Sequence, residues 1–244
     1  MNPIVPDWPA PERVRAVSTT RGGGVSRGPF ASLNLADHVD DDPADVAHNR
    51  RSLVAHLGLP HEPCWLTQMH GCRVVDAEAG RADADASLAT RPGPVCVVMT
   101  ADCLPLLICD DRGTRVAAVH AGWRGLAGGV IESAVASLCL EPDRLMVWLG
   151  PAIGPDAFEV GAEVRDAFVA IDPMAGGAFR PGDREGRWFA DLFTLARQRL
   201  ARLGVRRVFG GGDCTHSQPG RFFSYRRDGT TGRMASLIWL AQEH

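Results

Sequence analysis

Three apolar runs follow one another through the middle of the chain and constrain its fold more than any other feature. They are Val95–Thr100, Leu104–Cys109 and Val116–His120. Each run is short and ends at turn residues, so each predicts a buried β-strand. The segment DDRGT joins the second run to the third and is typical of a hairpin turn, which makes these two strands antiparallel. The bend "ADC" separates the first strand from the second.

Other runs extend this pattern. Further strands are expected at Val14–Ser18, Cys64–Met69, Arg73–Asp76, Leu145–Leu149, Val205–Phe209 and Phe222–Tyr225. Helices are expected from Asp42 to Gly58, from about Leu126 to Leu138, and from Asp191 to Gly204, each with apolar residues at helical spacing. Strands with interspersed helices and a hairpin predict an α/β (α+β) fold, a single domain over residues 1–244 with mixed β-sheets.

Composition limits the classes of partner. The chain of 244 residues is 45% hydrophobic and 23% charged, which is typical of a globular protein. A net charge of −3 with both signs interspersed excludes a sustained basic stripe, so no nucleic acid is expected as a partner. The N-terminus contains prolines where a signal peptide needs an apolar segment, and no stretch approaches a membrane span. We therefore expect a cytoplasmic protein without a membrane partner.

Cysteine usage points away from disulfides. The seven cysteines are an odd number and include no CxxC pair, which argues against a disulfide framework and a zinc ribbon. Most are expected to be small buried residues. Cys103 is the exception because it follows Asp102 in the bend between two predicted strands.

Three potential metal ligands stand at strand ends. His70 ends the run in TQMHG, Cys103 follows the first central strand, and His120 leads into the glycine-rich turn HAGWRG. Two imidazoles and one thiolate would hold zinc in three positions and leave the fourth for water or substrate. The three residues are too far apart in sequence to form a local motif. From the residues alone, two hydrogen-bonded histidines and a buried thiol therefore remain the alternative.

Three glycine- or arginine-rich segments are candidates for ligand binding. In HAGWRGLAGG, backbone N–H groups and Arg124 could grip an anion, or the glycines simply permit a tight turn. In TTRGGGVSRGPFASLNLADH, Arg21, Ser26 and Asn34 could line a pocket, although such segments are often plain loops. As a strand, RFFSYRR would place Phe223 and Tyr225 on the same side, but it could equally form a solvated charged face.

Several motifs occur in order along nearly the whole chain: TRGGGVS, SLNLADH, QMHG, TADCLPLLICD, HAGWRGLAGG, GPAIGPDAFEVG and CTHSQPGRFFSYRRDGTTGRMA. Together they closely resemble the bacterial YfiH/YlmD family, known as laccase-like polyphenol oxidases and as peptidoglycan editing factors, and related to the vertebrate protein FAMIN. The resemblance implies mixed sheets like those of a bacterial toxin cysteine deamidase. It also implies a zinc ion on His70, Cys103 and His120.

The resemblance further implies activity on purine nucleosides. The expected reactions are phosphorolysis of adenosine, inosine, guanosine and methylthioadenosine, and deamination of adenosine to inosine. Arg50 and Arg124 are the residues expected to bind phosphate, and Asp102 is expected either to shuttle a proton or to support Cys103. The residues expected to contact the nucleoside are Ser26, Asn34 and Tyr225.

Two other reaction classes stay open. Copper oxidation of phenols would use the same three ligands with Met69 or Met99 as an axial ligand. However, a full laccase needs a histidine-rich trinuclear cluster, and the chain contains no HxH pair. Alternatively, Cys103 would act as a nucleophile with His120 in an amide hydrolase that edits peptidoglycan precursors.

Overall fold

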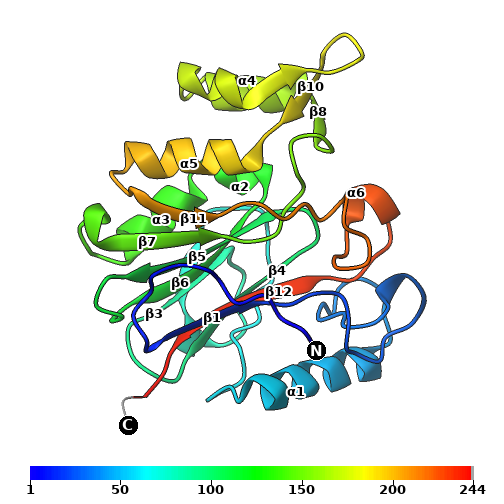
Figure 1. Ribbon diagram of the computed structural model, residues 1–244, viewed down its shortest axis with the longest axis vertical. Helices are drawn as coiled ribbons and strands as arrows, with labels where there is room; N and C mark the ends of the chain where they lie inside the picture. The colour runs from blue at the N-terminus through cyan, green and yellow to red at the C-terminus, as the bar shows by residue number, and fades with distance from the viewer. Residues whose placement is uncertain (243–244) are drawn as a thin grey trace.

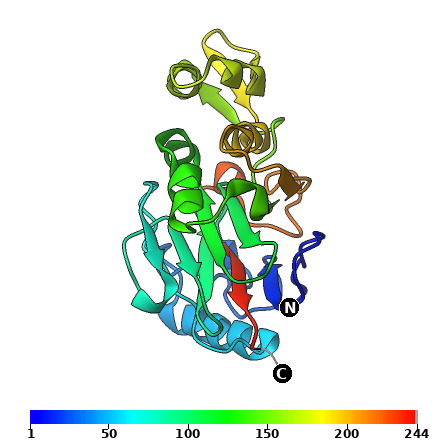
Figure 2. The same cartoon turned by 90° about the vertical axis from the view of Figure 1, so that its left-hand side faces the viewer.

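The computed structural model describes residues 1–242, in which two stacked β-sheets lie between layers of helices (Figures 1 and 2). The larger sheet has the strand order β11 (Arg207–Gly210), β7 (Leu145–Leu149), β5 (Leu104–Asp110), β6 (Val116–Ala121), β3 (Ala86–Ala89) and β2 (Val74–Asp76). The smaller sheet has the order β1 (Val14–Ser18), β12 (Met234–Leu240) and β4 (Val95–Thr100).

The larger sheet is mixed, as the sequence predicts. The β5–β6 hairpin is antiparallel, with Leu106 opposite Val119, and β7 pairs with β5 in the same sense. Parallel pairs lie at its two edges, β11 with β7 and β2 with β3. The expected α/β (α+β) class with mixed sheets is therefore confirmed.

Successive side chains of the central strands point to opposite faces of their sheet and so contribute to two different hydrophobic cores. In β5, Leu106 and Ile108 belong to the core under α2, α3 and α5, whereas Leu107 and Cys109 face the smaller sheet. In β4, Val98 belongs to the core between the sheets, and its neighbours on the other face pack toward α1. Both faces of both sheets are covered, which explains the nearly continuous apolar runs.

The helices follow the predicted signals with one break. Asp42 caps α1 by accepting a hydrogen bond from the backbone N–H of Ala44, and Gly58 ends the helix in a left-handed conformation. The second predicted helix is divided at Gly129, whose φ is +100°. The helices are α1 (Pro43–Leu57), α2 (Trp123–Gly128), α3 (Val130–Ser137), α4 (Ala162–Val169), α5 (Leu192–Arg202) and α6 (Tyr225–Asp228). Within residues 1–242, no helix has the length and apolar character that a membrane crossing requires.

A small third sheet lies at the top of the molecule beside α4 (Figure 1). Its order is β8 (Glu159–Gly161), β10 (Arg187–Ala190) and β9 (Phe179–Pro181). Short 3₁₀ helices complete the fold at Gly28–Phe30, Ala77–Ala79, Pro142–Arg144 and Pro173–Ala178. The sequence patterns did not predict this sheet, α4, β3 or β12.

Two predicted strands are wrong. Residues 64–69 make only isolated bridges, because the side chain of Gln68 takes the place of a strand partner and bonds both the N–H and the C=O of Met99 at 2.7 and 2.8 Å. The segment Phe222–Tyr225 leads into α6 instead, where Ser224 Oγ accepts a hydrogen bond from the Arg227 N–H. Phe222 and Phe223 are both buried, so the expected alternation of faces does not occur.

Candidate metal centre

His70, Cys103 and His120 converge at one end of the stacked sheets. Cys103 lies in the bend between β4 and β5, His120 lies near the end of β6, and His70 precedes β2. One potential ligand atom from each of the three lies within 4.8 Å of the others, and Cys103 Sγ is 3.9 Å from His70 Nε2. The two imidazole rings meet edge to face, with centroids 4.8 Å apart.

This arrangement fits a zinc ion. Ligand atoms at zinc–sulfur and zinc–nitrogen bond lengths around a tetrahedral ion lie roughly 3.3–3.8 Å apart, close to the observed separation of Sγ and Nε2. Gly122 permits the convergence: a Cβ atom there would lie 2.9 Å from His70 Cδ2 and 3.0 Å from Cys103 Sγ. The glycine at the start of the HAGWRG turn therefore serves the close packing of the ligands.

Asp85 orients two of the three ligands. Its carboxylate is buried and accepts a hydrogen bond from His120 Nδ1 at 2.8 Å, which leaves Nε2 free for a metal. The same carboxylate accepts the backbone N–H groups of His70 at 2.9 Å and Gly71 at 2.7 Å. These bonds hold His70 at a positive φ of 59°. A single side chain thus fixes both imidazoles.

The charges of the cluster reinforce one another. Burial alone raises the pKa of the Cys103 thiol, but the neighbouring imidazoles of His120 and His70 outweigh it and lower that pKa to about 6. Burial lowers the pKa of His120, yet the Cys103 thiolate and the Asp85 carboxylate raise it to about 9. The site therefore favours a thiolate, the form of cysteine that binds metals.

Asp102 shapes the bend that presents Cys103. Its φ is +97°, a conformation that residues other than glycine seldom adopt. One carboxylate oxygen accepts the Thr215 hydroxyl at 2.6 Å, and the other accepts the backbone N–H of Arg226 at 2.7 Å. Two residues of one loop, far from Asp102 in sequence, therefore hold the bend in a strained conformation beside a potential ligand.

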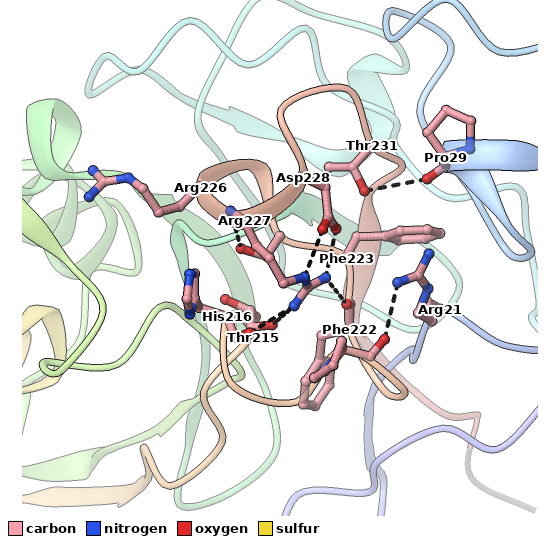
Figure 3. Close-up of polar contacts among 12 residues, drawn as sticks. Arg21, Pro29, Thr215, His216, Phe222, Phe223, Arg226, Arg227, Asp228 and Thr231 are labelled. Atoms are coloured by element: carbon pink, nitrogen blue, oxygen red, sulfur yellow. Dashed lines mark hydrogen bonds and ion pairs between the residues drawn. The ribbon is translucent and has the colours of Figure 1, made fainter.

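The loop from Thr215 to Thr231 is held by Arg227 (Figure 3). The guanidinium of Arg227 donates to the carbonyl oxygens of Thr215, His216 and Phe222 at 2.8–3.0 Å. It also pairs with Asp228, while the side chain of Arg226 extends away from this network. Arg227 thus acts as a structural clamp that places Tyr225 and Arg226 at the edge of the site.

A cavity of about 470 Å³ opens beside the three potential ligands, a volume typical of a small-molecule site. Aromatic residues contribute to its wall, with Trp123, Phe158 and Tyr225 on different segments, and Gln68 supplies an amide. The full lining is His38, Gln68, His70, Met99, Thr100, Ala101, Asp102, Cys103, His120, Trp123, Ile153, Phe158, Leu192, Tyr225, Arg226 and Arg233.

Four of the residues expected to bind substrate do not line this cavity. Ser26 and Asn34 are buried in the glycine-rich loop, where Ser26 accepts a hydrogen bond from Asn49 and Asn34 bonds both Ala36 and Asp41. Such side chains hold a loop together. Of the nucleoside residues predicted from sequence, the structure brings Tyr225 to the cavity.

The expected phosphate-binding arginines are also placed elsewhere. Arg50 donates to the Leu35 carbonyl and stacks on Trp65, which engages its guanidinium inside the fold. Arg124 is exposed and stacks on Trp123, outside the cavity lining. Arg21, a further candidate from the glycine-rich loop, donates to backbone carbonyls and lies over a phenylalanine ring.

Sequence patterns missed several residues of the site. Asp85 directly precedes β3 in DADASLA, where an aspartate at a strand end resembles an ordinary turn residue. Arg233 and His38 gave no separate signal, because each stands in a loop that has many polar residues. Only their position around the cavity distinguishes them.

The chain is similar to known proteins over nearly its whole length. A family model described as multi-copper polyphenol oxidoreductase laccase matches residues 15–241. A purine nucleoside phosphorylase of Pseudomonas aeruginosa is 60% identical over 238 residues, covering 97% of this chain and 98% of the relative. The Escherichia coli K12 protein named purine nucleoside phosphorylase YfiH is 54% identical over 241 residues, covering 97% and 98%.

Solved structures share the fold over almost the full chain. A Neisseria meningitidis protein superimposes with a TM-score of 0.96 at 51% identity, covering 99% of this chain and all of that one. YlmD from Geobacillus stearothermophilus gives 0.88 at 32% identity, covering 95% and 93%. Because one family model and proteins named YfiH and YlmD match it nearly end to end, the chain belongs to the YfiH/YlmD family of laccase-like proteins.

Proposed function

We propose that residues 1–244 form one catalytic domain, a zinc-dependent purine nucleoside phosphorylase that also deaminates adenosine. Its proposed substrates are adenosine, inosine, guanosine and methylthioadenosine. One observation carries the proposal: the His70–Cys103–His120 cluster borders a cavity with aromatic walls and the volume of a small-molecule site. The names of the similar proteins support the reaction class.

The cavity suits a purine nucleoside. Planar side chains from three segments, Trp123, Phe158 and Tyr225, offer surfaces on which a flat heterocycle can pack. Gln68 lies among them, but its amide is already bonded to Met99 at both ends, so it stiffens the wall. We propose that the base packs against this wall and that its sugar lies toward the metal ligands.

Phosphorolysis joins a phosphate oxygen to C1′ of the sugar as the bond from C1′ to the purine nitrogen breaks. The bonding electron pair leaves with the purine, which takes up a proton, and the products are the free base and a pentose 1-phosphate. A zinc ion bound by His70, Cys103 and His120 would supply Lewis acidity at this end of the cavity. The chain itself excludes water, orients the two substrates and supplies positive charge.

Deamination replaces the amino group of the adenine ring with oxygen from water and releases ammonia. This reaction needs a group that moves a proton, and Asp102 is the acidic side chain nearest to Cys103 in sequence. Both of its oxygens already accept hydrogen bonds, from Thr215 and Arg226. That pairing favours the supporting role, in which Asp102 holds the bend that presents Cys103.

The test is to incubate purified protein with adenosine, with and without phosphate, and to identify the products. Adenine that appears only with phosphate establishes phosphorolysis, and inosine under both conditions establishes deamination. Chelation and Cys103→Ala should each abolish both activities, whereas Cys139→Ala, which removes an exposed thiol, should change neither. If both activities survived Cys103→Ala and metal removal, the proposal would be wrong.

Copper-dependent oxidation of phenols is the second candidate, because the matching family model carries that description. Met99 lines the cavity and could serve as a weak axial ligand, whereas Met69 is 63% exposed. Within residues 1–242, the described side chains form a single group of three potential His, Cys or acidic ligands, and His244 lies outside that range. This favours one metal over a trinuclear cluster. Stoichiometric copper and a blue absorption band in protein purified without added metal would establish oxidation instead.

A cysteine amide hydrolase remains the third candidate. Cys103 and His120 lie close enough for nucleophile and base, with Asp85 orienting the imidazole as a third member. Full activity on a peptidoglycan precursor in the presence of a chelator, with an acyl group trapped on Cys103, would support this reaction and contradict the metal-dependent one.

We also propose a cytoplasmic location. All seven cysteines are free thiols, including the exposed Cys139, and reducing compartments preserve that state. Cell fractionation followed by immunodetection tests this, and recovery in the periplasm or the medium would contradict it.

A further inference from the structure

Two guanidinium groups line the cavity, those of Arg226 and Arg233. The two groups differ in the hydrogen-bond partners that they already have within the fold. Arg226 donates to the carbonyl oxygen of Glu159 at 2.7 Å and lies over the ring of Phe158, so it ties the loop of α6 to strand β8. Arg226 is therefore committed to a bridge between segments.

The side chain of Arg233, in contrast, bonds among the described residues only to the two that precede it in the chain. One of its terminal nitrogens donates to the carbonyl oxygens of Thr231 and Gly232, at 2.8 and 3.1 Å, and the group lies 5.8 Å from the ring of Tyr225. The backbone N–H of Arg233 is anchored to Asn34 Oδ1 at 2.9 Å. Across residues 1–242, no carboxylate comes within ion-pair distance of its guanidinium. Its remaining N–H donors have no bonded partner among these residues.

A partly buried cation without a counter-ion is costly for the fold. Burial lowers the pKa of Arg233, while the charges of Cys103 and Asp102 raise it, so the guanidinium lies within reach of their electrostatic field. Arginine stays protonated throughout the working pH range, so the positive charge persists. An anion that entered the cavity would offset the cost and use the free N–H groups.

We propose that Arg233 binds the phosphate co-substrate, with His38 beside it as a second donor. This inference rests on the proposed phosphorylase function and adds the phosphate subsite that phosphorolysis requires. The planar fork of a guanidinium matches two phosphate oxygens, which a lysine cannot reproduce. His38 lines the same cavity with a half-exposed side chain. Burial and the positive charge of Arg233 lower the pKa of His38, which favours a neutral imidazole that donates one N–H group.

A phosphate subsite also explains why the positive charge of Arg233 lines the cavity. The nucleoside is neutral and gains little from an unpaired guanidinium, whereas phosphate carries the opposite charge. The ring of Tyr225 lies 5.8 Å from the Arg233 guanidinium and lines the same cavity, where it offers a surface for the base. Phosphate on Arg233 would thus share one cavity with a base on Tyr225 and the potential metal ligands.

The test is steady-state phosphorolysis of inosine with phosphate as the varied substrate. Arg233→Met should raise the KM for phosphate roughly 10- to 100-fold, since charged hydrogen bonds are lost, and should change the KM for inosine much less. Arg233→Lys keeps the charge but not the fork and should give an intermediate KM. Arg91→Met is the matched control, because Arg91 is an exposed arginine paired with Glu78 away from the cavity.

Phosphate-independent deamination of adenosine and the metal content of each variant separate binding from folding. Both should stay near wild type in Arg233→Lys. If phosphate KM were unchanged in Arg233→Lys and Arg233→Met, or rose instead in Arg124→Met or Arg226→Met, the assignment to Arg233 would be overturned. If the wild-type protein showed no phosphate-dependent cleavage, the proposed function itself would fail, which is a distinct result.

Discussion

Asp85 Oδ1 lies 2.8 Å from His120 Nδ1 and 2.9 Å from the backbone nitrogen of His70, so one carboxylate oxygen is shared by two potential metal ligands. A shared acceptor of this kind fixes the tautomer of one imidazole and the backbone of the other at once. The geometry of the centre therefore depends on a residue that would not itself touch the metal.

We predict that Asp85→Asn weakens metal affinity by about 10- to 100-fold, because the amide cannot accept from all these donors at full strength. Competition titration with a chromophoric chelator measures the affinity. Asp83→Asn is the matched control: this exposed residue stands two positions earlier, and its substitution should leave affinity unchanged. Equal affinity in Asp85→Asn and wild type would contradict the orienting role.

Gly122→Ala tests the packing of the ligands. The added methyl group would lie 2.9 Å from His70 Cδ2 and 3.0 Å from Cys103 Sγ, so at least one ligand must move. We expect metal content and both activities to fall sharply, with a stability loss of about 1–3 kcal/mol. Gly177→Ala, where no atom lies within 4 Å of the new methyl group, should match wild type in metal analysis and thermal melting.

The central strands could be predicted because their signals are local, whereas the set His70, Cys103 and His120 follows from the family resemblance and from no local motif. Apolar runs such as Val95–Thr100 are buried on both faces, and Asp42 and Gly58 have the conformations that their residue types prefer. The strand predicted over residues 64–69 is absent because the side-chain amide of Gln68, and not a neighbouring strand, bonds the backbone of Met99. The hydrophobic periodicity of the sequence carries no signal for such a side-chain contact.

The sequence patterns also did not single out the residues that line the cavity, apart from Tyr225 and the residues near the potential metal ligands. Arg50 and Arg124 stand in motifs as rich in polar residues as the one that holds Arg233, so residue type does not separate them. The difference lies in tertiary contacts: Arg50 stacks on Trp65, whereas Arg233 faces the cavity. Asp85 escaped notice because its four hydrogen-bond partners come from positions 69–71 and 120.

The variant Asp102→Asn distinguishes two roles of Asp102: holding the bend that presents Cys103, or transferring a proton during deamination. Asparagine tolerates a positive φ and keeps the shape of the bend, but its NH₂ group cannot accept the bond that one carboxylate oxygen now receives. If Asp102 supports Cys103, phosphorolysis and deamination should fall by a similar factor, on the order of tenfold. Loss of deamination alone, with phosphorolysis intact, would instead identify Asp102 as the shuttle.

Thr215→Val is the companion variant, because it removes the hydroxyl that donates to Asp102 and keeps the carboxylate. Under the supporting role, it should reproduce part of the loss in both activities. If Thr215→Val kept wild-type rates of phosphorolysis and deamination, the hydrogen bond from Thr215 would not be what holds the bend.

Asp110 makes the stability of the fold depend on pH. This buried residue ends β5 and accepts the N–H groups of Thr114 and Arg115 at 2.6 and 2.8 Å, closing the β5–β6 turn. Burial raises its pKa, but these backbone bonds outweigh burial and hold the pKa below the ordinary value of 3.8. Since the folded pKa is depressed, the stabilisation is complete above that value and is lost as pH falls through the folded pKa.

We therefore predict that Asp110→Asn lowers the free energy of unfolding by about 2–4 kcal/mol at pH 7, because an amide group would face several N–H donors. The difference from wild type should stay constant down to about pH 5 and shrink below the ordinary carboxyl pKa, as the wild-type carboxylate also gains a proton. Urea unfolding at a series of pH values measures this. Asp111→Asn, which removes only surface pairs with Arg144 and Arg207, should cost less than about 1 kcal/mol. A pH-independent difference for Asp110→Asn would show that the turn needs the shape of the side chain and not its charge.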